Sequence, residues 1–412
     1  MSDPVPIYML MIILALIVGA YRLAYGRAAR FAQLAIGGMA RPRAQPRHHA
    51  RLAAVMAGLA GVCVYLVGLG LRTHEPSVVG DGLWLAALVG LPSLIIGIAL
   101  AKVRPDFAAR AHIERMAETG LMLLSLVAVI TTLGIVASLV FEATLFFQDV
   151  SVFEFIFGTH WSPQTAIRAG QAGQSGTFGA VPVFAGTFLI TAIALAVAGP
   201  VGLMVAIYLS EYASTRTRAV VKPAIEILAG IPTVVYGFFA LISVGPTIRH
   251  VAEMMGANVP TQSALAAGLV MGVMIIPLVS SLSDDVIRAV PQSLRDGSTA
   301  LGATRSETLI RVVFQSALPG IIGAFLLAIS RAIGETMIVV MAAGRAANLS
   351  ANPFDAVTTV TVQIVALLTG DQVFDSPRTL AAFALGLVLF IITLLLNIVA
   401  LAVVNRYRVR FE

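Results

Sequence analysis

The sequence predicts an all-α protein that crosses a membrane about nine times. Hydrophobic residues make up 58% of the 412 residues and charged residues only 12%, whereas soluble proteins carry roughly 25% charged residues. A membrane-spanning helix needs about 20 apolar residues, and runs of about this length recur along the chain. The predicted spans are residues 5–21, 52–71, 81–101, 118–142, 183–209, 224–245, 263–283, 320–342 and 379–404.

Basic residues orient these spans. Short cytoplasmic loops are enriched in lysine and arginine, so Arg406, Arg408 and Arg410 place the C-terminus in the cytoplasm. The N-terminus is then expected outside, and residues 5–21 are expected to be a retained span because Asp3, rather than a basic residue, precedes them. Counting back from the C-terminus, the basic cytoplasmic loops are residues 284–319, 210–223, 102–117 and 22–51.

The spans fall into two groups. Residues 1–117 hold the first three spans and a long basic loop, and they are predicted to form an N-terminal membrane extension. Residues 118–412 hold the other six spans and every informative motif. The extension offers no residues that suggest chemistry, although the basic string 41–49 is suited to contact with anionic lipid headgroups or to simple solvation.

The outer segment 144–182 is too long for a turn and is rich in phenylalanine. Aromatic side chains suit the membrane–water interface, so we expect a helix along the outer surface, with a docking surface for an external partner as the functional alternative. Two later spans contain Gly199-Pro200 and Gly230-Ile231-Pro232. Proline permits a bend in a membrane helix, which suits either a moving pathway or static packing.

The cytoplasmic loop 284–319 is too long and too regular to be only a connection. Apolar residues such as Leu294, Leu301 and Leu309 alternate with charged ones, which predicts two short amphipathic helices broken at Gly302. Such helices need a groove on a partner, and the loop therefore indicates a cytoplasmic subunit. The alternative is that it lies along the inner membrane surface.

Two charges, Arg331 and Glu335, are expected in the middle of the span 320–342. A charge at the centre of a membrane helix costs about 2.5–3.5 kcal/mol on insertion scales and by default marks a substrate or ion path. Their spacing of four residues places both side chains on one helix face. A guanidinium fork suits a phosphate-like oxyanion, so the pair predicts an anion path. The alternative is an ion pair that only fixes helix packing.

Other classes of function find less support. The net charge of +6 follows from the basic cytoplasmic loops rather than from nucleic-acid binding. The two lysines, Lys102 and Lys222, do not stand in a Walker A loop, so ATP hydrolysis is expected in another subunit and the chain is not expected to be an enzyme. The single cysteine and the scattered histidines give no metal-ligand spacing, and neither a metal nor a cofactor is expected.

Several strings resemble one family. The segment 296–302 (Asp-Gly-Ser-Thr-Ala-Leu-Gly) followed by 311–314 (Arg-Val-Val-Phe) looks like the coupling loop of bacterial ABC importer permeases, with Asp-Gly-Ser where that family has Glu-Ala-Ala. Over residues 118–412 the chain is similar to phosphate-specific transport permeases of the PstC type. The strings that carry this resemblance are Gly158-Thr159-His160-Trp161-Ser162-Pro163, Phe178-Gly179-Ala180-Val181-Pro182, Ile207-Tyr208-Leu209-Ser210-Glu211, Leu228-Ala229-Gly230-Ile231-Pro232-Thr233-Val234-Val235-Tyr236-Gly237 and Arg331-Ala332-Ile333-Gly334-Glu335-Thr336-Met337.

The resemblance implies a type I ABC importer core of six helices in the bacterial cytoplasmic membrane. It implies the permease subunit of an ATP-driven, binding-protein-dependent importer of inorganic phosphate. The implied partners are a second, PstA-like permease, a cytoplasmic ATPase dimer and an extracytoplasmic phosphate-binding protein. The implied substrate-path residues are Arg331, Glu335 and Thr336, and those of the coupling loop are Asp296, Gly302, Arg305 and Glu307.

The residues themselves leave alternatives open. A gradient-driven secondary anion carrier would transport without an ATPase, and a non-transporting membrane scaffold would use Arg331 and Glu335 only for packing. A fork of donors recognises shape and charge, so it does not separate phosphate from a close oxyanion.

Overall fold

The computed structural model describes residues 7–36, 44–74, 81–104, 107–163, 176–369 and 376–407. Within these residues, nine helical segments are long and apolar enough to cross a membrane, which confirms the predicted number. The chain separates into two compact units, Met1–Thr132 and Leu133–Glu412. The long helix α4 (Ala109–Asp149) begins in the first unit and ends in the second.

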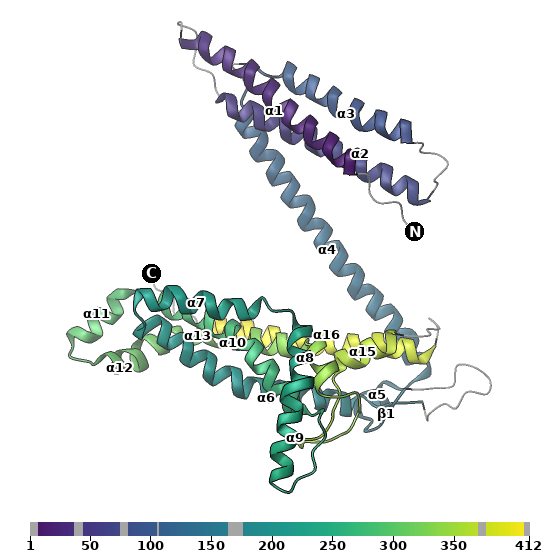
Figure 1. Ribbon diagram of the computed structural model, residues 1–412, viewed down its shortest axis with the longest axis vertical. Helices are drawn as coiled ribbons and strands as arrows, with labels where there is room; N and C mark the ends of the chain where they lie inside the picture. The colour runs from purple at the N-terminus through teal and green to yellow at the C-terminus, as the bar shows by residue number, and fades with distance from the viewer. Residues whose placement is uncertain are drawn as a thin grey trace. The chain divides into compact units, whose positions relative to one another are not determined.

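The first unit is built from α1 (Ile7–Ile36), α2 (Pro46–His74), α3 (Asp81–Ala101) and the start of α4. In Figure 1, α1, α2 and α3 lie side by side. Small residues form the contact, because side chains of alanine size let membrane helices approach closely. The buried alanines are Ala20, Ala24 and Ala28 of α1, Ala50, Ala53 and Ala57 of α2, and Ala99 of α3.

The second unit contains two short strands and the remaining helices. Strand β1 (Trp161–Ser162) pairs antiparallel with β2 (Thr177–Phe178). The helical elements after α4 are, in chain order, α5 (Val152–Phe157), which precedes β1, and then α6 (Val181–Ile207), η1 (Tyr208–Tyr212), α7 (Thr215–Ala229), α8 (Thr233–Phe239), η2 (Ala240–Val244), α9 (Gly245–Met254), α10 (Ala264–Ala289), α11 (Gln292–Ala300), α12 (Arg305–Thr308), η3 (Leu309–Val313), α13 (Phe314–Ile333), α14 (Met337–Ala342), α15 (Val360–Leu368) and α16 (Pro377–Tyr407).

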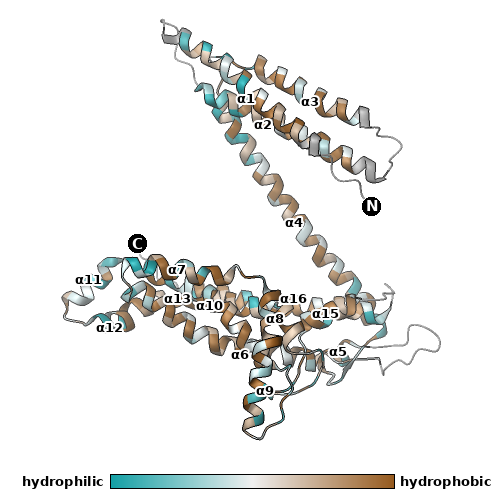
Figure 2. Ribbon diagram, in the orientation of Figure 1, coloured by the Kyte–Doolittle hydropathy of each residue, from teal (hydrophilic) through white to brown (hydrophobic). Residues whose placement is uncertain are grey.

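The core of the second unit is the contact between α6 and α10, and α13 packs against both of these helices. Glycine makes this approach possible: a Cβ on Gly272 of α10 would lie 2.8 Å from Cβ of Val197 and 2.9 Å from the carbonyl oxygen of Ala194. Figure 1 shows α9 standing across the direction of these helices. Figure 2 shows hydrophobic residues along most of α16 and hydrophilic ones on α11 and α12.

The predicted span 224–245 has the wrong limits. Residues 215–229 form the separate helix α7, and the apolar segment runs from Thr233 to Met254. Ser214 starts α7, because its hydroxyl accepts a hydrogen bond from the amide of Thr217 at 3.1 Å. Gly230-Ile231-Pro232, where proline was expected to permit a bend within one span, instead separate the two helices α7 and α8.

The aromatic segment is mainly a buried cluster, not a surface helix along its whole length. Phe146, Phe155 and Phe178 are buried, with Phe146 edge-to-face against the other two at centroid distances of 5.3 and 5.4 Å. Phe153 and Phe157 are exposed, at 73% and 60%. Edge-to-face pairs stabilise such a cluster beyond the burial of area. Residues 164–175 of this segment lie outside the described residues.

Candidate functional site

The predicted span that carries Arg331 and Glu335 is broken between them. Helix α13 ends at Ile333 with Gly334 as its cap, and α14 begins at Met337. The expectation that both charges share one helix face is therefore wrong. Among the ion pairs of the described residues, none joins Arg331 to Glu335.

The break has a local cause in the Glu335 side chain. Its Oε1 accepts hydrogen bonds from the amides of Met337 at 3.0 Å and Ile338 at 3.4 Å. The first amides of a helix have no partner within that helix, and a carboxylate is favoured at this end by the helix dipole. Glu335 thus stabilises the start of α14, while the carbonyl of Glu335 accepts from the hydroxyl of Thr361 at 3.0 Å.

Arg331 lies in the last turn of α13, the end of a helix where a cation is favoured. Its guanidinium approaches the sulfur of Met274 at 3.7 Å, and the residue is exposed. No carboxylate of the described residues lies within ion-pair distance of it. An uncompensated guanidinium on a membrane span is costly unless something polar faces it. Thr336, the last residue of the break, is half-buried and donates to the carbonyl of Gly334 at 3.4 Å.

A buried glutamine that was not predicted from the sequence, Gln363 of α15, links strand β1 to the segment after α14. The amide oxygen of Gln363 accepts from the indole of Trp161 at 3.0 Å. Its amide nitrogen donates to the hydroxyl of Thr358 at 3.2 Å and to the carbonyl of Arg345 at 3.3 Å. A buried polar group has to be hydrogen-bonded in this way. The signal in the sequence is a single amide inside the apolar run Val360–Leu368.

The cytoplasmic loop forms the predicted pair of helices, α11 and α12, separated at Gly302. Gly302 has φ of +90°, a region that L-residues with side chains avoid. Glu307 makes a capping box with Thr304: its Oε2 accepts from the Thr304 amide at 2.9 Å, and the Thr304 hydroxyl accepts from the Glu307 amide at 3.3 Å. Leu301 stands at the tip with 91% exposure.

The other two residues predicted for the coupling loop, Asp296 and Arg305, line a different cavity from Gly302 and Glu307. Asp296 accepts from the side-chain amide of Gln292 at 3.0 Å, and the Arg305 guanidinium lies 5.2 Å from the ring centroid of Tyr212, within range of a cation–π contact. Asp296 and Arg305 line a cavity of about 780 Å³, whereas Gly302 and Glu307 line a groove of about 630 Å³. The four residues therefore do not form one cluster.

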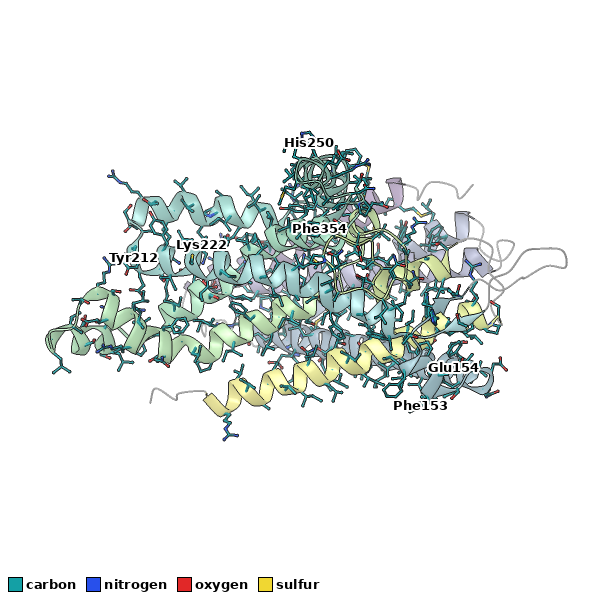
Figure 3. The ribbon with its side chains drawn as sticks, turned by 90° about the horizontal axis from the view of Figure 1, so that it is seen from below. Phe153, Glu154, Tyr212, Lys222, His250 and Phe354 are labelled. Carbon is teal, nitrogen blue, oxygen red and sulfur yellow. The ribbon has the colours of Figure 1, made fainter. Side chains whose placement is uncertain are left out.

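A network of ion pairs, also missed from the sequence, ties this region to the bundle. Asp284 of α10 is buried, and its Oδ2 accepts from Arg218 at 2.6 Å and from Lys222 at 2.9 Å, both on α7. Arg295 of α11 pairs with Glu211 of η1. Figure 3 shows Tyr212 and Lys222 toward the end of the unit that carries α11 and α12, with Phe153 and Glu154 at the opposite end.

The Lys222 ammonium keeps its charge throughout the physiological range. Burial lowers its pKa, but the hydrogen bonds and charges of Asp285 and Asp284 outweigh burial, so the pKa lies above the ordinary value of 10.5. A lysine whose pKa is raised on folding contributes stability that is complete below the ordinary value and is lost as pH rises through the raised one. Lys222 therefore brings its positive charge to the network at neutral pH.

Three comparisons with known proteins place the chain. Residues 198–409 match the family described as "Binding-protein-dependent transport system inner membrane component". The chain is 34% identical over 248 residues to "Probable ABC transporter permease protein YqgH" of Bacillus subtilis (strain 168), which covers 60% of this chain and 76% of that protein. It is 35% identical over 277 residues to "Phosphate transport system permease protein PstC 1" of Mycobacterium tuberculosis (strain ATCC 25618 / H37Rv), which covers 61% and 81%.

The fold is also similar to one in a solved structure described as a bacterial alginate ABC transporter in complex with an alginate pentasaccharide-bound periplasmic protein. The TM-score is 0.50 at 15% identity, and the match covers 72% of this chain and 97% of that one. At this identity the likeness concerns the fold alone.

Proposed function

Because the chain belongs to the family of inner membrane components of binding-protein-dependent transport systems, we propose that it is the permease subunit of an ATP-driven importer of inorganic phosphate. The observation that carries this substrate is the identity of 30–35% to several permeases named for phosphate transport. The chain is a multi-pass inner membrane protein, and its family is one of transport components rather than enzymes.

The proposed partners are a second, PstA-like permease, two copies of a cytoplasmic ATPase and an extracytoplasmic phosphate-binding protein. Two observations support a separate ATPase: the sequence holds no Walker A loop, and the α11–α12 hairpin presents Leu301 to solvent at its tip. An exposed apolar residue on a short helical hairpin suits a groove on another subunit.

The proposed substrate path passes the break between α13 and α14. Arg331 supplies a guanidinium without a carboxylate partner among the described residues, which suits an oxyanion. Glu335 and Thr336 hold the break in place from the side of α14. The proposal thus gives Arg331 the contact with the anion and gives Glu335 the task of fixing the backbone around it.

Residues 1–117 are proposed to be a membrane extension added to a permease core at 118–412. In support, α1, α2 and α3 pack against one another with their own buried residues, and the family match begins at residue 198.

The proposal is tested by uptake of labelled phosphate into proteoliposomes. We expect uptake that requires ATP and all the proposed components. Uptake by this chain alone, without ATP, would instead establish a gradient-driven carrier. Uptake by neither preparation, with correctly assembled complex, would favour a scaffold.

Substitution of Gly302 by alanine is expected to loosen the link between ATP hydrolysis and uptake. A side chain at φ of +90° strains the turn by about 1–2 kcal/mol, which displaces α11 relative to α12. The measurement is the ratio of phosphate imported to ATP hydrolysed. Gly256→Ala is the matched control, because Gly256 also has positive φ, +79°, and open space around it but lies after α9. Equal ratios in the two variants would contradict a coupling role for the hairpin.

A further inference from the structure

The cavity of about 780 Å³ on the cytoplasmic side is rich in arginine. We call it the arginine cavity. It lies between η1, the start of α7, the end of α10 and the α11–α12 hairpin. Its charged lining residues are Arg218, Arg288, Arg295, Arg305, Glu211 and Asp296.

Two of its four arginines, Arg218 and Arg295, already form ion pairs and hydrogen bonds within the protein. Arg218 pairs with Asp284 at 2.6 Å and donates to the carbonyl of Leu209 at 3.3 Å. Arg295 pairs with Glu211 and donates to the carbonyl of Ile287 at 2.7 Å. Their side chains keep only 18% and 14% exposure. These two guanidiniums hold the walls of the cavity together and have few donors left for a ligand.

The other two arginines are not committed. Arg288, near the end of α10, and Arg305, at the start of α12, are exposed, and neither has a carboxylate within ion-pair distance among the described residues. The guanidinium of Arg305 lies over the face of the Tyr212 ring, a contact that leaves the edge of the planar guanidinium available. Each therefore presents a fork of donors without a compensating charge.

The charge of the lining is unbalanced toward positive. Arg218 is paired with Asp284 and Arg295 with Glu211, which leaves Arg288 and Arg305 against the single lining carboxylate of Asp296. Basic residues on a cytoplasmic surface follow from membrane topology, but topology alone does not gather them around one concave site. A concave site lined by one sign of charge concentrates ions of the opposite sign.

We propose that the arginine cavity binds a phosphate-class anion between Arg288 and Arg305. A guanidinium matches phosphate oxygens through two parallel hydrogen bonds, and two guanidiniums match a dianion. Because Arg305 belongs to α12 of the coupling hairpin and Arg288 to α10, a bound anion would connect the hairpin to α10. The proposal stands apart from the transported substrate, because it concerns another site at the cytoplasmic end of the chain. The anion has two possible sources, free cytoplasmic phosphate and the headgroup of an anionic lipid.

The test is the binding of labelled orthophosphate to the purified full chain by equilibrium dialysis. In neutral detergent we expect Arg288→Gln to weaken binding about tenfold, as for the loss of one charge-assisted contact. Arg305→Gln is expected to weaken it similarly. Both arginines are exposed, so neither change should disturb the fold.

Two controls separate this site from others. Arg216→Gln removes an exposed arginine of α7 that does not line the cavity and is expected to leave the affinity unchanged. Arg331→Gln is expected to retain the binding that depends on Arg288, even if it abolishes uptake. Anion binding at Arg288 and Arg305 and phosphate import past Arg331 can therefore each be disproved without disproving the other.

A second arm identifies the source. The chain is placed in nanodiscs of neutral lipid or of lipid containing phosphatidylglycerol. If wild type binds orthophosphate more weakly in the anionic discs, and Arg288→Gln shows no such difference between the two discs, the site is assigned to lipid headgroups. Equal binding by wild type in both discs assigns it to free phosphate. Binding that is the same in wild type, Arg288→Gln and Arg305→Gln, or no binding of orthophosphate in any preparation, would overturn the proposal.

Discussion

Replacement of Asp284 by asparagine is expected to lower the free energy of unfolding of the chain by about 3 kcal/mol. Asp284 is 1% exposed, and its Oδ2 accepts from both Arg218 and Lys222. Loss of one partner from a buried ion pair costs about 3–5 kcal/mol, because the remaining charge stays desolvated. We expect the lower end, since Arg218 and Lys222 keep 18% and 24% of their side-chain exposure.

The measurement is equilibrium unfolding of the purified chain in mixed micelles with increasing SDS, followed by circular dichroism. Asp285→Asn is the matched control on the next residue. Asp285 contacts Lys222 at the same distance of 2.9 Å but is 62% exposed, and exposed ion pairs contribute about 0–1 kcal/mol. Equal losses from the two variants would show that the burial of Asp284 has no energetic weight.

The Asp284 network also shows where prediction from sequence ends. The nine spans could be predicted because the length and apolarity of a run are local properties. The contact between Asp284 and Arg218 joins residues 66 positions apart. The predicted cytoplasmic loops contain many lysines and arginines, and any of them could be the partner of Asp284. Local patterns indicate that a charge needs a partner but do not say which one it finds.

Two glycines illustrate the same limit at the candidate site. Gly302 stands between two amphipathic strings, so the helix break there could be predicted, and its positive φ agrees. Gly334 stands inside a continuous apolar run, so hydropathy favours one unbroken span across it. The break at Gly334 depends on the Glu335 carboxylate, which accepts from the amides of Met337 and Ile338. Hydropathy treats that side chain as an unfavourable charge and does not register it as a helix cap.

The correction changes the expected role of the two charges. On a continuous helix, Glu335 would neutralise Arg331, and both would be needed together. In the structure Glu335 caps α14 through its side chain, and within the described residues the guanidinium of Arg331 has the Met274 sulfur as its hydrogen-bond partner. The anion-path hypothesis then depends on the arginine alone, and the two residues can be tested separately.

Replacement of Arg331 by glutamine is expected to lower ATP-dependent phosphate uptake by about tenfold or more, because charge-assisted hydrogen bonds contribute about 1.5–3 kcal/mol each. The change should leave assembly intact, since no ion pair within the described residues depends on this guanidinium. The measurement is initial uptake of labelled phosphate in proteoliposomes, normalised to the amount of assembled complex.

Two further variants decide between a path and a packing role for Arg331. Glu335→Gln keeps an oxygen that accepts from the α14 amides, so it should retain most uptake. Arg249→Gln removes another exposed arginine of a candidate span, one already paired with Glu253 at 2.7 Å, and should also retain it. If Arg331 and Glu335 acted together as packing, their variants would fail equally and with loss of assembly. Loss of phosphate uptake in Arg331→Gln alone, with assembly intact, would instead support contact between Arg331 and the transported anion. Within the described residues that guanidinium has no charged partner.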